Sequence, residues 1–187
     1  MLSSRLLKIA FLGLTLSVAG CSRESSDAVQ PAASSGTSAE AGVIDRSHKG
    51  NRMPDLSFRD AAGHSLQFTS LRGKPVLLNL WATWCAPCKA EMPALDRLGA
   101  AQGHRMKVLT ISQDMAKLEK VAGFFKEQHI AWLDPWLDPD NALSSHYQVN
   151  VLPTTILYDS GGQEVWRFIG PRDWGDAETA ALLAEAK

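Results

Sequence analysis

The stretch that decides the fold is residues 76–89, which read VLLNLWATWCAPCK. Its first seven residues are almost continuously apolar and have the length of one strand, which is typical of a central strand covered on both faces. A helix is expected to follow from about Ala86 to Ala101, with a kink at Pro93 inside it. Cys85 and Cys88 therefore lie where a buried strand turns into a helix.

Hydrophobic periodicity predicts further elements on either side of this stretch. Strands or hairpin arms are expected at 56–59, 65–68, 106–112, 130–133, 154–159 and 163–169. Helices are expected from a cap at Asp114 to His129, from Asn141 to Tyr147, and from Asp173, with Asp176 at the third helical position. The paired Trp-Leu-Asp-Pro segments at 132–139 predict a loop. Strands separated by helices imply parallel crossovers, so we expect an α/β fold with a mixed central sheet and helices on both faces.

Composition excludes several classes of protein. The chain has 187 residues, of which 45% are hydrophobic and 21% are charged, as in a packed globular domain. Its net charge of −1 gives no broad electrostatic attraction to nucleic acid, so we expect no nucleic-acid partner. Three cysteines are too few for a disulfide-dense scaffold or for a four-thiolate zinc site.

Residues 1–20 have the pattern of a secretory signal peptide, here of the lipoprotein type. Arg5 and Lys8 precede an apolar stretch at 9–19 that is too short for a transmembrane helix, which needs about 20 residues. The sequence Val-Ala-Gly before Cys21 resembles a bacterial lipobox, in which Cys21 becomes the acylated first residue of the mature chain. The alternative is ordinary cleavage that leaves Cys21 free. The lipobox accounts for an odd cysteine that a secreted protein would otherwise leave unpaired.

Residues 21–47 are rich in Ser, Ala, Gly and Thr and carry no aromatic side chain. Such a segment buries too little apolar surface to offset the entropy of ordering it, which indicates a flexible tether. The folded domain is then expected over residues 48–187, a usual size for one hydrophobic core.

The two cysteines of residues 76–89 are placed for redox chemistry. A thiolate at Cys85 would face the free backbone N–H groups and the positive dipole end of the following helix, and both lower the pKa of a thiol. We expect Cys85 to be the exposed attacking thiol and Cys88 the buried thiol that resolves a mixed disulfide. Two alternatives are half of a metal site, for which no second pair is evident, and a static disulfide, whose short loop would stabilise little.

Residues 71–95, LRGKPVLLNLWATWCAPCKAEMPAL, resemble the active-site region of the thioredoxin superfamily. Within it they are most similar to the TlpA/ResA-like thiol:disulfide reductases, which are membrane-tethered and face the periplasm. The similarity extends to Val-Leu-Pro-Thr-Thr at 151–155 and Gly-Pro-Arg-Asp-Trp at 170–174. It implies a thioredoxin-like fold with an N-terminal β-hairpin and a helix-containing insertion around 114–133. It also implies a lipid-anchored location in the envelope of a Gram-negative bacterium.

The resemblance implies residues that bind the substrate. Pro153 matches a cis-proline that faces the dithiol, and a cis X–Pro bond usually marks a specific tight turn. The backbone of Leu152 would pair with the substrate peptide as an added strand. Trp84, next to the attacking cysteine, is expected to offer an apolar wall to the partner protein.

The resemblance also implies a proton acceptor. Glu91 lies three residues after Cys88, on nearly the same helical face, and matches a carboxylate that exchanges a proton with the resolving thiol. The alternative is a solvated glutamate paired with a neighbouring lysine. Many thioredoxins carry a buried Asp on the central strand, but this chain has Asn79 there, which cannot titrate.

The leading hypothesis for function is a protein-disulfide reductase. Reduced Cys85 attacks a substrate disulfide, Cys88 resolves the mixed disulfide, and an upstream membrane electron donor reduces the disulfide left behind. We expect a monomer with no cofactor and no bound metal. The resemblance implies disulfide-bearing protein substrates, such as factors whose cysteines bind copper or haem during cytochrome assembly.

Other functions could use the same fold. A disulfide-forming oxidant would differ only in the direction of electron flow, which the Ala-Pro pair between the cysteines does not decide. A copper-binding module resembles a pattern with three residues between the cysteines and a distal His, whereas this chain has two residues and no evident His. A peroxidase resembles a pattern with Thr three residues before its cysteine, where this chain has Ala82.

Overall fold

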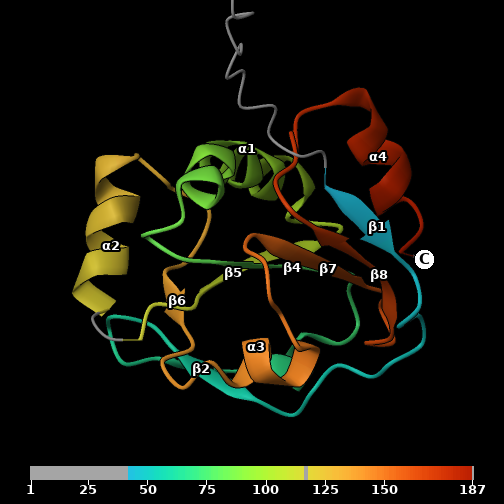
Figure 1. Cartoon of the computed structure of the whole chain (residues 1–187), viewed down its shortest axis with the longest axis horizontal. Coiled ribbons are helices and arrows are strands. Elements are labelled where there is room, and N and C mark those ends of the chain that lie inside the picture. The colour runs from blue at the N-terminus through green and yellow to red at the C-terminus, as the bar shows by residue number, and fades with distance from the viewer. Residues whose placement is uncertain (1–41, 116–117, 187) are drawn as a thin grey trace, which may run out of the picture. The chain divides into compact units, whose positions relative to one another are not determined.

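The computed structural model describes residues 42–115 and 118–186, in which eight strands form one mixed sheet of order β1-β8-β7-β4-β5-β6-β2-β3 (Figure 1). The strands are β1 (Val43–Asp45), β2 (Ser57–Arg59), β3 (Ser65–Gln67), β4 (Val76–Trp81), β5 (Lys107–Ser112), β6 (Trp136–Leu137), β7 (Thr154–Tyr158) and β8 (Glu164–Ile169). The helices are α1 (Ala86–Gln102), α2 (Leu118–Glu127), α3 (Ala142–Tyr147) and α4 (Ala177–Leu183), with a short 3-10 helix at Phe68–Leu71. The predicted signal peptide, Cys21 and most of the predicted tether lie outside the described residues.

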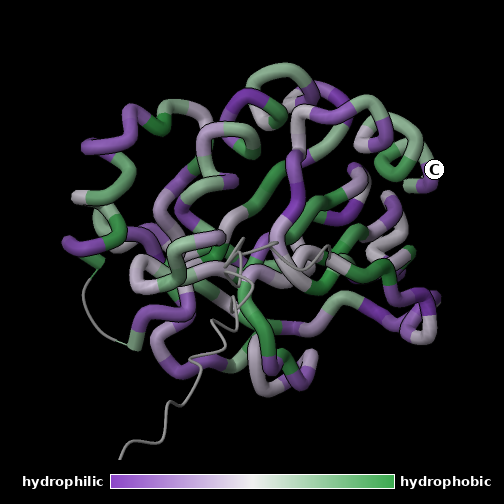
Figure 2. Tube along the Cα trace, turned by 45° about the horizontal axis from the view of Figure 1, so that its top comes forward, coloured by the Kyte–Doolittle hydropathy of each residue, from purple (hydrophilic) through white to green (hydrophobic). Residues whose placement is uncertain are grey.

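Strand β4 lies near the middle of the sheet, as its apolar sequence predicts. It runs parallel to β5 and antiparallel to β7, and all six of its residues are buried. Because side chains alternate along a strand, Leu77 and Trp81 enter the core under α1, α2 and α4, whereas Leu78 and Leu80 enter the core under α3 and the β2–β3 hairpin. Figure 2 shows hydrophobic residues gathered along the inner strands and mixed hydropathy along the outer helices. The predicted α/β fold class is confirmed.

The start of the folded unit differs from the predicted boundary at residue 48. Residues 43–45, expected to be tether, form β1, in which Val43 is paired with Ile169 of β8. Gly42 lies so close to β8 that a Cβ atom there would be 2.1 Å from the Phe168 ring. A three-residue strand is too short to show the period-two alternation on which the sequence analysis depends.

The region between α2 and α3 also differs from the prediction. No strand forms at 130–133, because the backbone N–H groups of residues 131–133 donate to the carboxylate of Asp96. Instead Trp136 and Leu137, predicted to lie in a loop, form β6, which runs parallel to β5. A strand of only two residues can form here because its neighbours β5 and β2 supply the hydrogen-bonding partners.

Two helix starts are corrected by the structure. Helix α4 begins at Ala177 with Asp176 as its N-cap, whose carboxylate accepts from the backbone N–H of Thr179 at 2.8 Å. The predicted start at Asp173 therefore lies three residues before the observed N-cap. The carboxylate of Asp114, predicted to cap a helix, is bound to Thr83 at the end of β4. Within residues 42–115 and 118–186, no helix is both long enough and apolar enough to cross a bilayer.

Candidate active site

A disulfide joins Cys85 and Cys88 at the point where β4 ends and α1 begins. Its S–S distance is 2.00 Å and the Cα atoms lie 5.3 Å apart. Cys85 is the N-cap of α1, and its Sγ accepts a hydrogen bond from the backbone N–H of Cys88 at 3.2 Å. The sulfur of Cys85 therefore occupies the position that stabilises a thiolate once the disulfide is reduced.

Cys85 is more exposed than Cys88, which is the order that the sequence predicts. Cys88 is fully buried, whereas Cys85 keeps 6% of its surface exposed. The prediction that Cys85 is exposed is wrong for this oxidised form, because the disulfide and its surroundings cover most of the residue. Trp84, immediately before it, is 67% exposed and leaves its indole free to meet a partner.

The Leu152–Pro153 peptide bond is cis, as predicted. The carbonyl oxygen of Pro153 accepts a hydrogen bond from the backbone N–H of Gly170 at 2.9 Å, which ties the loop to the end of β8. Leu152 packs against the core cluster that contains both cysteines. The cis-proline loop therefore belongs to the same site as the disulfide.

An open groove of about 370 Å³ is lined by Trp84, which precedes Cys85 in the chain, and by Leu152, which precedes Pro153. The groove brings together three of the exposed large apolar side chains, namely Trp84, Met115 and Val151. The other described residues that line it with Leu152 are also uncharged: Gln113, Asn141, Ser144, Val149 and Asn150. The predicted substrate-binding residues Trp84 and Leu152 thus share one neutral, partly apolar surface.

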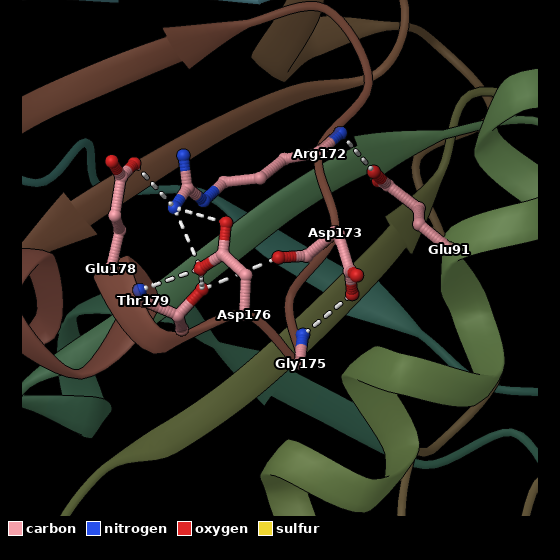
Figure 3. A network of polar contacts seen from close by, with 7 residues as sticks. All are labelled: Glu91, Arg172, Asp173, Gly175, Asp176, Glu178 and Thr179. Atoms are coloured by element: carbon pink, nitrogen blue, oxygen red, sulfur yellow. Dashed lines mark hydrogen bonds and ion pairs between the residues drawn. The ribbon is translucent and has the colours of Figure 1, made fainter.

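Glu91 is buried rather than solvated, with 5% of its surface exposed. Its Oε1 accepts from Nδ2 of Asn79 at 2.7 Å, and its Oε2 accepts from Nε1 of Trp174 at 3.2 Å. Its Oε2 also accepts from the backbone N–H of Arg172 at 3.3 Å, the contact that Figure 3 shows. Burial raises the pKa of Glu91 from the ordinary 4.5 to about 7, although the hydrogen bonds from Asn79, Arg172 and Trp174 oppose the rise. A carboxyl group with this pKa can take up or release a proton near neutral pH.

Two partners of Glu91 were missed by the sequence analysis. Trp174 and Arg172 enter the sequence analysis only within the Gly-Pro-Arg-Asp-Trp similarity at 170–174. Both lie more than 80 residues from Glu91 along the chain. No local pattern could reveal these contacts. The one feature of the sequence that pointed to Arg172 and Trp174 was their place in the family-like segment at 170–174, just after β8.

No cluster of His, Cys, Asp or Glu side chains suited to a metal ion occurs within the described parts of the chain. The carboxylate of Glu91, one helical turn after Cys88, is instead held by neutral N–H donors. This arrangement is suited to thiol–disulfide exchange with a proton acceptor close by.

Comparison with known families agrees with this geometry. Residues 48–183 match the Redoxin family. The chain belongs to that family. Its relatives include the thioredoxin-like protein YneN of Bacillus subtilis, 33% identical over 115 residues that cover 61% of this chain and 67% of YneN. The thiol-disulfide oxidoreductase ResA of Geobacillus kaustophilus is 32% identical over 117 residues, covering 61% of this chain and 65% of ResA. The chain thus spans about two thirds of the length of these relatives.

Solved structures show the same fold. The pneumococcal exposed lipoprotein thioredoxin Etrx1 of Streptococcus pneumoniae is 26% identical, with a TM-score of 0.58, and the match covers 71% of this chain and 98% of Etrx1. A DsbE thiol:disulfide interchange protein of Chlorobium tepidum is 24% identical, with a TM-score of 0.65 and coverage of 74% and 98%. The predicted similarity to TlpA/ResA-like proteins of the thioredoxin superfamily is confirmed, and the chain is a thiol:disulfide oxidoreductase.

Proposed function

We propose that this Redoxin-family protein is a protein-disulfide reductase that faces the periplasm, held by a lipid on Cys21 at a membrane of a Gram-negative envelope. The observation that carries the reductase proposal is the Cys85–Cys88 disulfide at the start of α1, with the buried Glu91 one helical turn further on. Substrates are proteins whose cysteines must be free, such as those that bind copper or haem during cytochrome assembly. ResA-type relatives, which are named thiol-disulfide oxidoreductases, support the exchange reaction.

The reaction has two exchange steps. The Cys85 thiolate attacks one sulfur of a substrate disulfide, which forms a mixed disulfide and releases the first substrate thiolate. Cys88 then loses its proton and attacks the sulfur of Cys85, which releases the second substrate thiolate and forms the Cys85–Cys88 disulfide seen here. Two electrons pass to the substrate, so an upstream membrane donor must supply two electrons to restore the dithiol.

The groove lined by Trp84 and Leu152 supports a protein substrate. Trp84, Met115 and Val151 offer apolar side chains to it, while Gln113 and Asn150 can bind peptide groups. The described residues that line the groove carry no charge, and they suit an uncharged or apolar segment next to the substrate cysteine. Leu152, at its edge, is placed to pair with that segment as an added strand.

The midpoint potential of the dithiol tests the direction of electron flow. The full chain with Cys21→Ser is equilibrated against glutathione or dithiothreitol, so that only two thiols titrate. A potential near that of thioredoxin, about −270 mV or lower, is expected for a reductase. A value near −120 mV would make the protein a disulfide-forming oxidant instead. Failure to form a reversible disulfide would favour a metal-binding module.

Trapping experiments test the roles of the cysteines. With a disulfide-bonded peptide, Cys88→Ala is expected to accumulate a covalent complex through Cys85, because the resolving thiol is missing. The matched Cys85→Ala variant should accumulate none, since Cys88 is fully buried. Trapping through Cys88 instead would reverse the assignment.

Metabolic labelling tests the anchor. The wild-type chain is expected to incorporate radiolabelled palmitate and to sediment with membranes. Cys21→Ser should incorporate none and remain in the periplasmic soluble fraction. An unlabelled wild-type chain would contradict the lipid anchor but leave the reductase proposal intact.

A further inference from the structure

The carboxylate of Glu91 is held in the core by neutral N–H donors from two separate parts of the chain. Asn79 reaches it from β4, and Trp174 reaches it from the segment between β8 and α4. The backbone of Arg172 reaches it from the same segment (Figure 3). Asn79 and Trp174 are themselves almost fully buried, with 0% and 2% of their surfaces exposed. The donors are therefore fixed in place rather than recruited from solvent.

The nearest cation on this segment does not pair with Glu91. The guanidinium of Arg172 extends away from the carboxylate, and its Nη2 pairs with Asp176 at 2.9 Å and approaches Glu178 at 3.6 Å (Figure 3). The carboxylate of Asp173, on the same segment, accepts a hydrogen bond from the backbone N–H of Gly175. A guanidinium against Glu91 would keep it ionised at every relevant pH, whereas neutral donors leave both protonation states accessible.

The donors differ in which protonation state they favour. Asn79 donates through Nδ2 to Glu91 and to Thr155, while its Oδ1 is buried without a partner. Because a carboxamide carries both a donor and an acceptor, rotation of the amide would offer Oδ1 to a protonated Glu91. The indole of Trp174 can only donate, and it donates more strongly to a carboxylate than to a neutral acid.

Packing holds the indole of Trp174 at this position. Its ring meets Phe168 edge to face at 6.1 Å, and the guanidinium of Arg172 lies over both rings, 5.2 Å from the centroid of Phe168 and 5.9 Å from that of Trp174. Asp176, which caps α4, binds that guanidinium in turn. The end of β8 and the start of α4 therefore fix where the indole N–H points.

We propose that Trp174 is a positioning residue of the exchange reaction, whose indole N–H holds the Glu91 carboxylate and favours its ionised form. This inference rests on the proposed role of Glu91 as acceptor of the Cys88 proton. Ionised Glu91 takes the proton from the Cys88 thiol, and the resulting thiolate attacks the sulfur of Cys85 in the mixed disulfide. The S–S bond to the substrate breaks, and the electron pair leaves with the substrate sulfur.

The test compares two buried tryptophans that each make one indole hydrogen bond. Trp174→Phe removes the donor to Glu91 and keeps an aromatic ring against Phe168. Trp166→Phe is the matched control, because Trp166 is fully buried in the same core cluster but donates to the carbonyl oxygen of Leu182. Both changes are made in the full chain carrying Cys21→Ser.

The first readout is the titration of the Glu91 carboxyl carbon by NMR in the oxidised protein labelled with ¹³C-glutamate, assigned with Glu91→Gln. Trp174→Phe is expected to raise the Glu91 pKa by about one pH unit, since a hydrogen bond to the charged form is lost. Trp166→Phe should leave it unchanged. An unchanged pKa in Trp174→Phe, or an equal rise in both variants, would overturn the inference.

The second readout is the pH dependence of the rate at which the reduced protein reduces a disulfide-bonded peptide. Its midpoint should move upward in Trp174→Phe by the same amount as the Glu91 pKa. A midpoint that stays in place would overturn the inference for the reaction. A wild-type protein that reduces no peptide at any pH would instead contradict the proposed function, while the carboxyl titration would still report on Trp174.

A measurement without substitution keeps the inference testable if Trp174→Phe does not fold. In the protein labelled with ¹⁵N-tryptophan, the indole N–H signal of Trp174 should shift with pH around a midpoint near 7, following its acceptor. The signal of Trp166 should not, and Glu91→Gln should abolish the shift. A Trp174 signal that does not follow Glu91 would contradict the inference.

Discussion

Asp114 accepts hydrogen bonds from both the backbone N–H and the hydroxyl of Thr83, at 2.8 and 2.7 Å. Thr83 lies two residues before Cys85, and Asp114 lies two residues after β5. Ser112, the last residue of β5, also donates to this carboxylate, at 2.6 Å. The turn that carries the disulfide is thus tied to the neighbouring strand through one buried side chain.

Loss of that carboxylate should destabilise the protein. Asp114→Ala leaves the amide and hydroxyl of Thr83 buried without their acceptor, so the free energy of unfolding should fall by about 2–4 kcal/mol. Asp134→Ala is the control, because Asp134 is about half exposed and pairs only with Lys107, and it should cost less than about 1 kcal/mol. Urea unfolding of the oxidised proteins measures both, and equal losses would contradict a special role for Asp114.

Glu91 should make stability depend on pH near neutrality. Its pKa is about 7 in the folded protein against the ordinary 4.5, so between these values the folded state binds more protons than the unfolded state. This contribution to stability is fully present below pH 4.5 and is lost as the pH rises through 7. Relative to Glu91→Gln, the wild-type free energy of unfolding should fall by about 3 kcal/mol from pH 4.5 to 8.

The control for that measurement is Glu127→Gln, which changes an exposed glutamate at the end of α2. Its curve of unfolding free energy against pH should run parallel to that of the wild type across the same range. A Glu91→Gln curve that also runs parallel to the wild type would show that Glu91 is ionised at neutral pH in the folded state.

Removal of the Trp84 side chain should weaken substrate binding more than stability. Trp84→Ala takes the largest apolar side chain from the groove, so the KM for a disulfide-bonded protein substrate should rise about 5- to 30-fold, with little change in kcat. Trp132→Ala is a close control, because Trp132 is 62% exposed, similar to the 67% of Trp84, but does not line the groove. Equal effects of both changes on KM would rule out the groove as the binding surface.

Strand β1 should contribute to the stability of the domain. A chain that begins at residue 48 lacks β1 and the contact of Ile44 with the core under α1, whereas a chain that begins at Gly42 keeps both. The shorter chain should lose about 1–3 kcal/mol of unfolding free energy, since it exposes apolar surface and frees the edge of β8. Thermal unfolding of the two oxidised chains side by side measures the difference, and coincident curves would place the boundary at residue 48 after all.

Sequence reasoning succeeded where the signal is local. The apolar run of β4 followed directly by Cys85 and Cys88 predicts both the central strand and the helix start, because all the information lies within 14 residues. The two hairpins, β2–β3 and β7–β8, follow from alternation on both sides of a turn that contains glycine. The cis bond at Pro153 required the family resemblance, because X–Pro alone does not specify the isomer.

It failed where tertiary contacts override local pattern. Residues 130–133 have the apolar character of a strand, but the carboxylate of Asp96, more than 30 residues away, accepts their N–H groups. Strand β1 forms because β8 presents a free edge to it. The three residues of β1 carry no pattern that predicts this pairing. The partners of Glu91 come from β4 and from beyond β8, so its burial could not be seen in the helix that carries it.

The order in which the chain is made has a consequence for the thiols. Synthesis proceeds from the N-terminus, so Cys85 and Cys88 are made long before Pro153, and Trp174 follows 83 residues after Glu91. Until then the nascent chain carries the two cysteines without the cis-proline loop or the indole that contacts Glu91. A chain that is released before residue 174 would therefore carry both cysteines without the indole that contacts Glu91 in the finished protein.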